Sequence, residues 1–374
     1  MRILIVGAGI AGLLLYRELK NQGFVVDLIE KKNHLNVQGA GICLPGNALH
    51  WFAALGLKGA ILDKAYQVHE IRYENQHRAL LSRATLDQGV LKSQPFVALP
   101  RAELLNILAD GVRSDIQFGR AIVEIISDGK TESVLFNDGR VTDYDLVIGA
   151  DGLHSNVREQ CFSSPQLLDL NVIHWRFTVD MPTANLAPSY LIGKTDAFMF
   201  YPIGIDKVYC YGQVTANALT ETFYSDEKKK LLAIFDDYHD SVKFAIDRAQ
   251  HIVKGRLKSV VSREIYNSRA VLIGDALHGC PPSLQQGVAQ ALEDVMALSK
   301  SLKVHSDIDI ALDDFKKKRL KQVSWVIDES NKVIALAQLG QSKFGRLVRN
   351  TLIKLQGPQN VKAWRKLMTE QGNT

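Results

Sequence analysis

The chain opens on short apolar segments separated by an amphipathic one. Residues 3–6 form a continuous apolar run, and residues 13–19 repeat apolar side chains at helical spacing. Residues 25–29 form a second run that is apolar except for Asp27. Apolar runs this short are typical of strands buried on both faces, as in parallel sheets covered by helices. The first thirty residues therefore predict a strand, a helix and a second, parallel strand.

Later segments extend this pattern and then depart from it. The apolar runs 146–148 and 270–273 each lead into a glycine-containing turn and predict further strands of the same sheet. Residues 66–98 and 166–215 are instead rich in β-branched and aromatic residues with polar ones between them, which predicts a second, mostly antiparallel sheet. Residues 225–249 repeat apolar residues at helical spacing and predict one helix.

The composition argues against several classes of protein and of site. The 374 residues are 46% hydrophobic, and a net charge of +5 is too small and too scattered to predict a nucleic-acid partner. The four cysteines form no C-x-x-C pair, so neither a metal site nor a disulfide framework is predicted, and reduced thiols favour a cytoplasmic location. No apolar run reaches the length of about 18 residues that a membrane-spanning helix needs.

The turn after the first strand is the first segment whose residues indicate a ligand. It reads GAGIAG over residues 7–12, and the second strand ends at Glu30. In such a turn Gly7 permits the tight bend, Gly9 lets the backbone approach a pyrophosphate, and Gly12 lets helix and strand pack closely. Glu30 is then placed to accept hydrogen bonds from ribose hydroxyls. The turn predicts a dinucleotide site, but its spacing does not distinguish FAD from NAD.

Two more strand–turn–helix stretches carry polar residues. One reads DGLHSNVR over residues 151–158, and the other reads GDALHGCPPSLQQG over residues 274–287. Asp275 at the end of its strand could accept from ribityl hydroxyls. A helix beginning near Gln286 would direct free N–H groups at negative charge on a bound ring. The alternative for each stretch is a plain junction without a ligand.

These motifs together resemble the single-component flavoprotein monooxygenases of the para-hydroxybenzoate hydroxylase type. The resemblance rests on the turn at 7–12 with Glu30, on D-G-x-x-S-x-x-R at 151–158 and on G-D-A-x-H-x-x-x-P at 274–282. LPRAELLNIL, in which Arg101 opens a helix, is a softer match. Residues 39–57 look most like the urate hydroxylase and salicylate hydroxylase branches. The resemblance covers residues 1 to about 300 in the expected order.

The resemblance implies an FAD site with a transient NADPH or NADH co-substrate, since no second glycine fingerprint is present. Glu30 would hold the adenosine ribose, Arg101 and Asp275 would lie by the phosphates or ribityl chain, and Asp151 and Arg158 would support the pyrophosphate region and NAD(P)H use. Pro282 and the 285–289 loop would line the flavin ring. The full set of expected cofactor-binding residues is Gly7, Gly9, Ala11, Gly12, Glu30, Lys31, Gly41, Arg101, Ile122, Asp151, Arg158, Asp275, Pro282, Gln286, Gly287 and Val288.

The chain departs from the family pattern at this last loop. The family often reads G-Q-G-x-N where this chain has Gln285, Gln286, Gly287, Val288 and Ala289. A glutamine at the first position is strained if that position needs a positive φ. Ala289 lacks an amide that could contact the ring.

Aromatic and polar residues of the second sheet are candidates for a substrate pocket. Tyr201 and Arg176 are the catalytic candidates, Tyr201 as a polar group near the reacting ring and Arg176 as the partner of an anionic group. Plain core packing is the alternative for each aromatic residue, because alternation along a strand puts only half of them on one face. His278 is expected to be a structural loop residue. The other candidates are Trp175, Phe198, Phe200, Tyr209, Tyr211 and Gln213.

By the resemblance, the function is an FAD-dependent monooxygenase that uses NAD(P)H and O2 to hydroxylate or epoxidise a small aromatic or heteroaromatic substrate through a flavin C4a-hydroperoxide. Gln285 and Ala289 leave open a flavin-dependent reductase or dehydrogenase of the same fold. A basic tail leaves open a flavin-binding, membrane-associated protein without monooxygenase turnover.

The fold class predicted is α/β, with a Rossmann-like FAD-binding domain, a mostly antiparallel substrate domain and C-terminal helices. The FAD-binding domain comprises 1–65, 99–165 and 266–305. The substrate domain comprises 66–98 and 166–265, and a helical segment comprises 306–374, with a helix expected at 307–338.

The tail at 342–368 is strongly basic and contains no acid. Peripheral contact with an anionic membrane is one interpretation, because Phe344, Leu347, Val348 and Leu352 share a helical face. A helix docked on the core with a basic outer face is the other. The basic residues are Lys343, Arg346, Arg349, Lys354, Lys362, Arg365 and Lys366.

Overall fold

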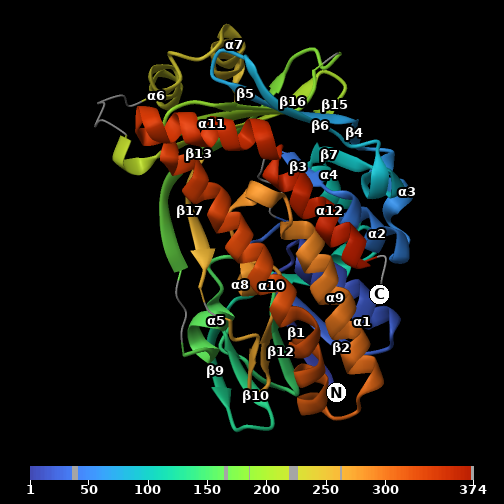
Figure 1. The fold of residues 1–374 in the computed structure, drawn as a ribbon. Helices are drawn as coiled ribbons and strands as arrows, with labels where there is room; N and C mark the ends of the chain where they lie inside the picture. Colours follow the sequence, from blue (N-terminus) through green and yellow to red (C-terminus); the bar gives the residue numbers. More distant parts are fainter. Residues whose placement is uncertain (36–40, 164–166, 185, 219–225, 262, 372–374) are drawn as a thin grey trace.

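The computed structural model divides into a parallel-sheet half and an antiparallel-sheet half, which Figure 1 shows one above the other. It describes residues 1–35, 41–163, 167–184, 186–218, 226–261 and 263–371. The first two residues of the 39–57 stretch therefore lie outside the described part. Within the described part, no helix is long and apolar enough to cross a bilayer.

A six-stranded sheet forms the core of the first half, in the order β18-β19-β12-β1-β2-β8. All neighbours pair in parallel except β18 and β19. The predicted buried strands at 3–6, 146–148 and 270–273 are confirmed, because they are almost completely inaccessible to solvent. The strand at 25–29 is only partly buried, with Val25 63% exposed. The strands are β1 Arg2–Val6, β2 Val25–Glu30, β8 Ile116–Phe118, β12 Leu146–Gly149, β18 Tyr266–Asn267 and β19 Ala270–Leu272.

Helices cover this sheet, and one long apolar cluster joins them to it. Parallel strands need such crossover helices, and burial on both faces explains their unbroken apolar runs. The helices of this half are α1 Ile10–Asn21, α2 Gly46–Ala54, α3 Lys58–Leu62, α4 Arg101–Ala109, α5 Asn156–Cys161, α8 Asp275–His278 and α9 Gly287–Val304.

A seven-stranded sheet forms the second half, in the order β17-β13-β16-β15-β14-β5-β6. Its pairs are antiparallel except β14 with β5, so the predicted mostly antiparallel sheet is confirmed. Its strands are β5 Glu70–Asn75, β6 Leu80–Thr85, β13 Leu167–Asp180, β14 Ser189–Ile192, β15 Asp196–Gly204, β16 Lys207–Thr215 and β17 Val253–Val260.

Two small sheets complete the strands. One lies at the junction of the halves and pairs β3 and β4 with β7, so residues 66–68 and 96–98 join a strand of the first half. The other is a ribbon beside β12. Their strands are β3 Gly41–Leu44, β4 Tyr66–Val68 and β7 Phe96–Pro100 in the first, and β9 Ile122–Ser127, β10 Glu132–Phe136 and β11 Val141–Tyr144 in the second.

The single helix predicted at 225–249 is wrong, since two helices occupy this region, α6 Glu227–Ile234 and α7 Asp240–Arg248. Tertiary contacts hold the turn between them. The Tyr238 hydroxyl donates to Asp196, and the His239 backbone N–H donates to the carbonyl of Gln76 at 2.9 Å. The His239 ring then accepts from the N–H of Ser241 and caps the second helix.

Three C-terminal helices span both halves, α10 Ile308–Gln338, α11 Lys343–Gln356 and α12 Gln359–Gln371. The long helix α10 runs along the molecule, and α11 crosses the second half (Figure 1). Gly357 ends α11 with φ of +72°, so the basic tail is two helices. Trp364 on α12 is 1% exposed and Leu367 is inaccessible, so 359–368 is docked on the core rather than facing a membrane.

Candidate active site

The glycine turn between β1 and α1 is built as its sequence requires. Gly7 has φ of +104°, and a Cβ there would lie 2.7 Å from the Ala150 carbonyl oxygen. A Cβ on Gly12 would collide with the Gly7 carbonyl oxygen, whereas a Cβ on Gly9 would meet nothing within 4 Å. No side chain caps the α1 N-terminus, so its N–H groups are available to an anion on the open side of Gly9.

Glu30 at the end of β2 closes this turn. One carboxylate oxygen accepts from the Ala8 N–H at 3.1 Å, and the other accepts from the Lys32 N–H at 3.0 Å. The predicted acid is therefore held beside the glycine turn, with lone pairs left for a hydroxyl donor.

The turn after β12 is held by buried polar groups. Asp151 accepts from the N–H groups of Asn156 at 2.7 Å and Val157 at 3.3 Å through one oxygen. Its other oxygen is buried and has no hydrogen-bond partner among the described residues. Burial raises the pKa of Asp151, although the surrounding N–H and hydroxyl donors oppose the rise.

Two predicted cofactor residues support loops rather than lining the site. Arg158 is 1% exposed and donates to the carbonyls of Ala276 at 2.6 Å and Leu153 at 2.5 Å, which ties the second motif to the third. Ile122 is buried, and its carbonyl accepts from the Asn156 amide at 3.0 Å. Both residues would influence a cofactor through the loops that they hold.

The loop from β19 to α9 faces the junction of the two halves. Gly274 has φ of +58°, and a Cβ there would lie 2.9 Å from the Ala11 side chain, so the third motif packs against the first. Asp275 opens α8, a 3₁₀ turn η4 follows at Pro282–Leu284, and α9 begins after Gln286 without a side-chain cap. The free N–H groups and dipole of α9 favour negative charge in front of it.

A cavity of about 760 Å³ lies between the halves. This volume is in the upper part of the range of roughly 300–1,000 Å³ found for small-molecule sites. The first half contributes residues from all three predicted loops together with β3 and α4. These are chiefly Gly9, Ala11, Gly41, Arg101, Gly152, Asp275, Pro282, Gly287 and Val288.

The antiparallel sheet contributes polar and aromatic side chains to the same cavity. Arg176 and His174 on β13 line it, and the Arg176 Nε atom is buried without a hydrogen-bond partner among the described residues. The His174 ring stacks on Tyr211 at 5.5 Å between centroids, and burial lowers the pKa of His174 to about 4, helped by the charge of Arg176. His174 is therefore neutral at physiological pH.

Two arginine side chains, Arg101 and Arg176, lie where the antiparallel sheet meets the first half. Burial lowers the pKa of the Arg101 guanidinium, the charge of Asp275 opposes this, and the charge of Arg176 adds to it. The arginines and Asp275 are thus close enough to influence one another. An anionic ligand group would gain from both guanidiniums.

Some of the aromatic candidates line the cavity and others do not. Tyr209, Tyr211 and Gln213 on β16 line it, as does Phe198. Trp175 and Phe200 do not line it. Trp175 instead points to the far face, where its indole N–H donates to Glu227 at 2.7 Å.

Tyr201 does not have the role that was predicted for it either. It is completely buried in an apolar cluster with Phe96 and does not line the cavity. Its hydroxyl lies 3.1 Å from that of Tyr190, which does line the cavity. Tyr201 therefore positions another tyrosine, and its own hydroxyl stays away from a bound ring.

A third part of the cavity is apolar. Val172, Leu257 and Ile334 form one apolar cluster where β13 and β17 pass beside α10, and all three line the cavity. Ile353 on α11 adds to this lining. The cavity thus extends from the glycine turns, past Arg176, to an apolar region under the C-terminal helices.

Comparisons with known proteins agree with this geometry. Residues 1–330 match the family described as an FAD binding domain. The chain is 30% identical over 371 residues to 2-heptyl-3-hydroxy-4(1H)-quinolone synthase of Pseudomonas aeruginosa, covering 95% of this chain and 94% of that one. The chain belongs to the FAD-dependent aromatic monooxygenases. It is also 28% identical over 377 residues to aurachin C monooxygenase/isomerase of Stigmatella aurantiaca, with 97% and 96% of the chains covered.

The fold of this monooxygenase is that of solved relatives. The crystal structure of Klebsiella pneumoniae HpxO complexed with FAD and uric acid superposes with a TM-score of 0.87 at 21% identity, covering 99% of this chain and 96% of that one. At this level of identity the likeness establishes the architecture alone.

The residues present fit FAD. The open side of Gly9 and the uncapped α1 N-terminus suit the pyrophosphate, and Asp275 and Arg101 line the cavity between that turn and the sheet. The uncapped α9 N-terminus suits the negatively charged edge of the ring. Gln286 and Ala289 are exceptions among the predicted loop residues, since both are buried and neither lines the cavity.

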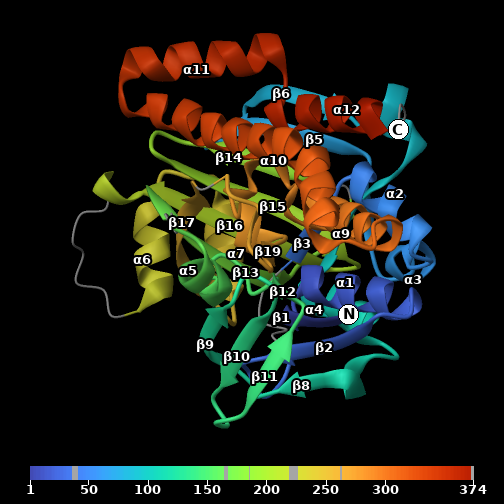
Figure 2. The same ribbon diagram turned by 90° about the horizontal axis from the view of Figure 1, so that it is seen from below.

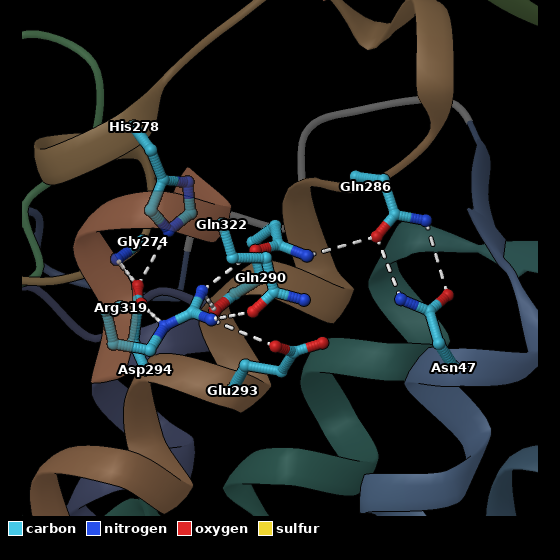
Figure 3. A network of polar contacts seen from close by, with 9 residues as sticks. All are labelled: Asn47, Gly274, His278, Gln286, Gln290, Glu293, Asp294, Arg319 and Gln322. Atoms are coloured by element: carbon cyan, nitrogen blue, oxygen red, sulfur yellow. Dashed lines mark hydrogen bonds and ion pairs between the residues drawn. The ribbon is translucent and has the colours of Figure 1, made fainter. Parts of the chain in front are cut away.

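A buried polar network holds the loop that carries Asp275 (Figure 3). Asp294 on α9 accepts from the Gly274 N–H at 2.9 Å, from His278 at 2.6 Å and from Arg319 on α10 at 2.7 Å. Arg319 also donates to Glu293 at 2.9 Å. His278 is confirmed as a structural residue of the loop.

The network continues from Arg319 to the start of α9 and on to α2. Arg319 donates to Gln290 at 2.8 Å, and Gln290 donates to Gln286 at 3.2 Å. Gln286 and Asn47 then exchange two amide hydrogen bonds, at 2.9 and 3.2 Å (Figure 3). The loop is thus fixed at both ends by side chains from three helices.

Gln285 adopts the left-handed conformation, with φ of +49°, so the condition under which a glutamine is expected to be strained at this position is met. Its amide donates to the Tyr190 hydroxyl, and its amide oxygen accepts from Asn360 on α12 at 3.3 Å. Trp364 on α12 donates to the neighbouring Leu284 carbonyl at 2.7 Å. Side-chain hydrogen bonds therefore offset the strain that a glycine would avoid.

The sequence analysis did not identify Tyr190, Asn360, Trp364 or His174 as site residues. The first three come from a strand and a helix far along the chain from the loop that they hold. His174 could have been found by applying strand alternation to Arg176, because residues two apart share a face.

Substitutions at two glycines should separate cofactor binding from folding. Gly9→Ala points a methyl into the space that suits the pyrophosphate, so FAD affinity should fall at least about tenfold while unfolding free energy stays within about 1 kcal/mol. Gly12→Ala forces a contact with Gly7 and should cost about 1–3 kcal/mol of stability. Fluorescence titration with FAD and urea unfolding of the apoprotein measure both. Unchanged FAD affinity in Gly9→Ala would contradict the placement.

Breaking the buried network should destabilise the fold. Arg319→Met removes the buried guanidinium that pairs with both Asp294 and Glu293 and should cost about 3–5 kcal/mol in urea unfolding. Lys332→Met removes an exposed ion pair on the same helix and should leave the unfolding midpoint unchanged. Equal midpoints for the two variants would show that the network does not support the fold.

The strain at Gln285 can be measured with a matched pair. Gln285→Ala and Gln285→Gly both remove the hydrogen bonds to Tyr190 and Asn360, but only glycine relieves the positive φ. Gln285→Gly should therefore be more stable than Gln285→Ala by about 1 kcal/mol in urea unfolding. Equal stability of the two variants is the outcome that would refute a strained loop.

Proposed function

We propose that this monooxygenase uses NADH or NADPH and O2 to hydroxylate a heteroaromatic ring that carries an apolar substituent. The observation that carries the proposal is the continuous cavity. It joins the loops that suit the flavin, the guanidinium of Arg176 and the apolar cluster around Ile334. The names of the quinolone and aurachin relatives support a ring of this class.

FAD, when bound, would supply the redox chemistry between the nicotinamide and dioxygen. The chain supplies orientation and charge. The Arg176 side chain lines the cavity and can place its guanidinium beside a ring oxygen, where a positive charge favours the deprotonated, more electron-rich ring. Neutral His174 can donate to or accept from the same ring, and Tyr211 offers an aromatic face.

The apolar cluster would take the substituent. Val172, Leu257 and Ile334 present no hydrogen-bonding group, so an aliphatic chain there displaces water and orients the ring toward the flavin loops. We place the reaction in the cytoplasm, where NAD(P)H is available and where the four unpaired cysteines stay reduced.

The test is the oxidation of NADH and of NADPH with 2-heptyl-4(1H)-quinolone, 2-methyl-4(1H)-quinolone and urate as probes, followed by mass spectrometry with ¹⁸O2. The heptyl compound should stimulate oxidation most strongly and should gain one labelled oxygen atom. Flavin that stays oxidised with every probe would overturn the proposal. Product formed without O2 would instead favour a reductase.

Arg176→Met should raise KM for the quinolone about 10–100-fold, the loss expected for one hydrogen bond from a charged group. Arg83→Met, at an exposed arginine on β6, should leave KM unchanged. Steady-state NAD(P)H oxidation measures both variants. An unchanged KM in Arg176→Met would remove Arg176 from substrate binding.

A further inference from the structure

The helix α11 turns an apolar stripe outward, unlike an ordinary surface helix. On the inner side, Arg349 is 2% exposed and Ile353 is 7% exposed. On the outer side, Phe344 is 76%, Leu347 66% and Leu355 79% exposed. A surface helix normally turns its apolar stripe toward the core, so this outward stripe needs another explanation.

The orientation of α11 is set by its buried arginine. Arg349 donates to the Gly193 carbonyl at 2.7 Å and lies within 3.4 Å of the carbonyls of Lys194 and Ala337. These bonds tie the helix to the β14–β15 turn and to the end of α10. The outward face is therefore a fixed feature of the fold.

The outer residues form one stripe. Residues 344, 347, 351 and 355 follow one another at intervals of three or four, the spacing of a single helical face. Thr351 is the only member of the four that is not strongly apolar. Figure 2 shows α11 along the outer edge of the molecule, beside α10.

The charged side chains of α11 itself all have one sign. Lys343 and Lys354 are exposed, Arg346 is partly exposed, and residues 342–358 contain no acid. In the described part of the chain, none of these three side chains forms an ion pair. An apolar stripe bordered only by cations is complementary to a surface with an apolar interior and anionic head groups.

We propose that α11 docks this enzyme on the surface of an anionic membrane. Phe344, Leu347 and Leu355 enter the boundary between head groups and acyl chains, and Lys343 and Lys354 contact lipid phosphates. A second copy of the chain is disfavoured, because two such faces would bring lysines and arginines against one another. The proposal concerns the surface only and does not depend on the reaction.

Docking in this way has a consequence for the cavity. Arg349 and Ile353, on the inner face of α11, line the cavity. The same helix thus forms both a wall of the cavity and the proposed membrane contact.

The test is co-sedimentation of the full-length, FAD-loaded protein with vesicles of phosphatidylcholine, with and without phosphatidylglycerol. Wild type should sediment with the anionic vesicles and be released by high salt. The triple variant Phe344→Ser, Leu347→Ser, Leu355→Ser should lose at least about thirtyfold in partition coefficient. Lys343→Gln and Lys354→Gln should each lose about fivefold on anionic vesicles.

Ile205→Ser is the matched control, because Ile205 is 92% exposed in the hairpin turn between β15 and β16. It should bind vesicles as the wild type does, and all variants should keep the flavin spectrum and the unfolding temperature of wild type. The proposal is overturned if wild type stays in the supernatant with anionic vesicles at low salt, or if the triple variant binds like wild type. A wild-type dimer that the triple variant abolishes, without vesicle binding, would assign the face to a second copy.

Discussion

The carboxylate of Asp294 is inaccessible to solvent. The hydrogen-bond donors that it requires hold in place the loop that faces the flavin site. An uncompensated buried charge costs several kcal/mol, so a fold that buries one must bring donors to it. The donors here are the Gly274 backbone, His278 and Arg319. Burial alone would raise the pKa of Asp294, but the charges of His278 and Arg319 hold it below its ordinary value. Because these donors come from a strand end, a short helix and α10, satisfying the charge brings those elements together.

The local parts of the flavin site could be predicted from the sequence. Gly7, Gly9 and Gly12 act through backbone geometry that their spacing already specifies, and Asp275 follows a strand with an unmistakable apolar run. The parts that join distant segments could not be predicted. Asn360 and Tyr190 reach Gln285 because α12 and β14 contact the loop in the folded chain. The periodicity of the sequence does not predict that contact.

On the substrate side of the cavity, the sequence predicted the kinds of side chain correctly but only some of the individual residues. Aromatic strands opposite the flavin loops were expected and are present. Which aromatic side chains face the cavity depends on strand register, and a shift of one residue exchanges Trp175 for His174. Tyr201 shares the strand face of Met199, which lines the cavity, but Tyr201 itself is buried behind Tyr190, and the sequence does not predict that packing. Arg176, by contrast, lines the cavity as expected.

The central claim is that one cavity holds both the flavin ring and an apolar-substituted ring. The most direct measurement is a difference-absorption titration of the FAD-loaded protein with 2-heptyl-4(1H)-quinolone, in wild type and in Ile334→Trp, whose indole would fill the apolar end. A shared cavity predicts a saturable change in the flavin spectrum that is weakened at least about tenfold by the tryptophan. A flavin spectrum that does not respond, or responds with equal affinity in both proteins, would contradict it.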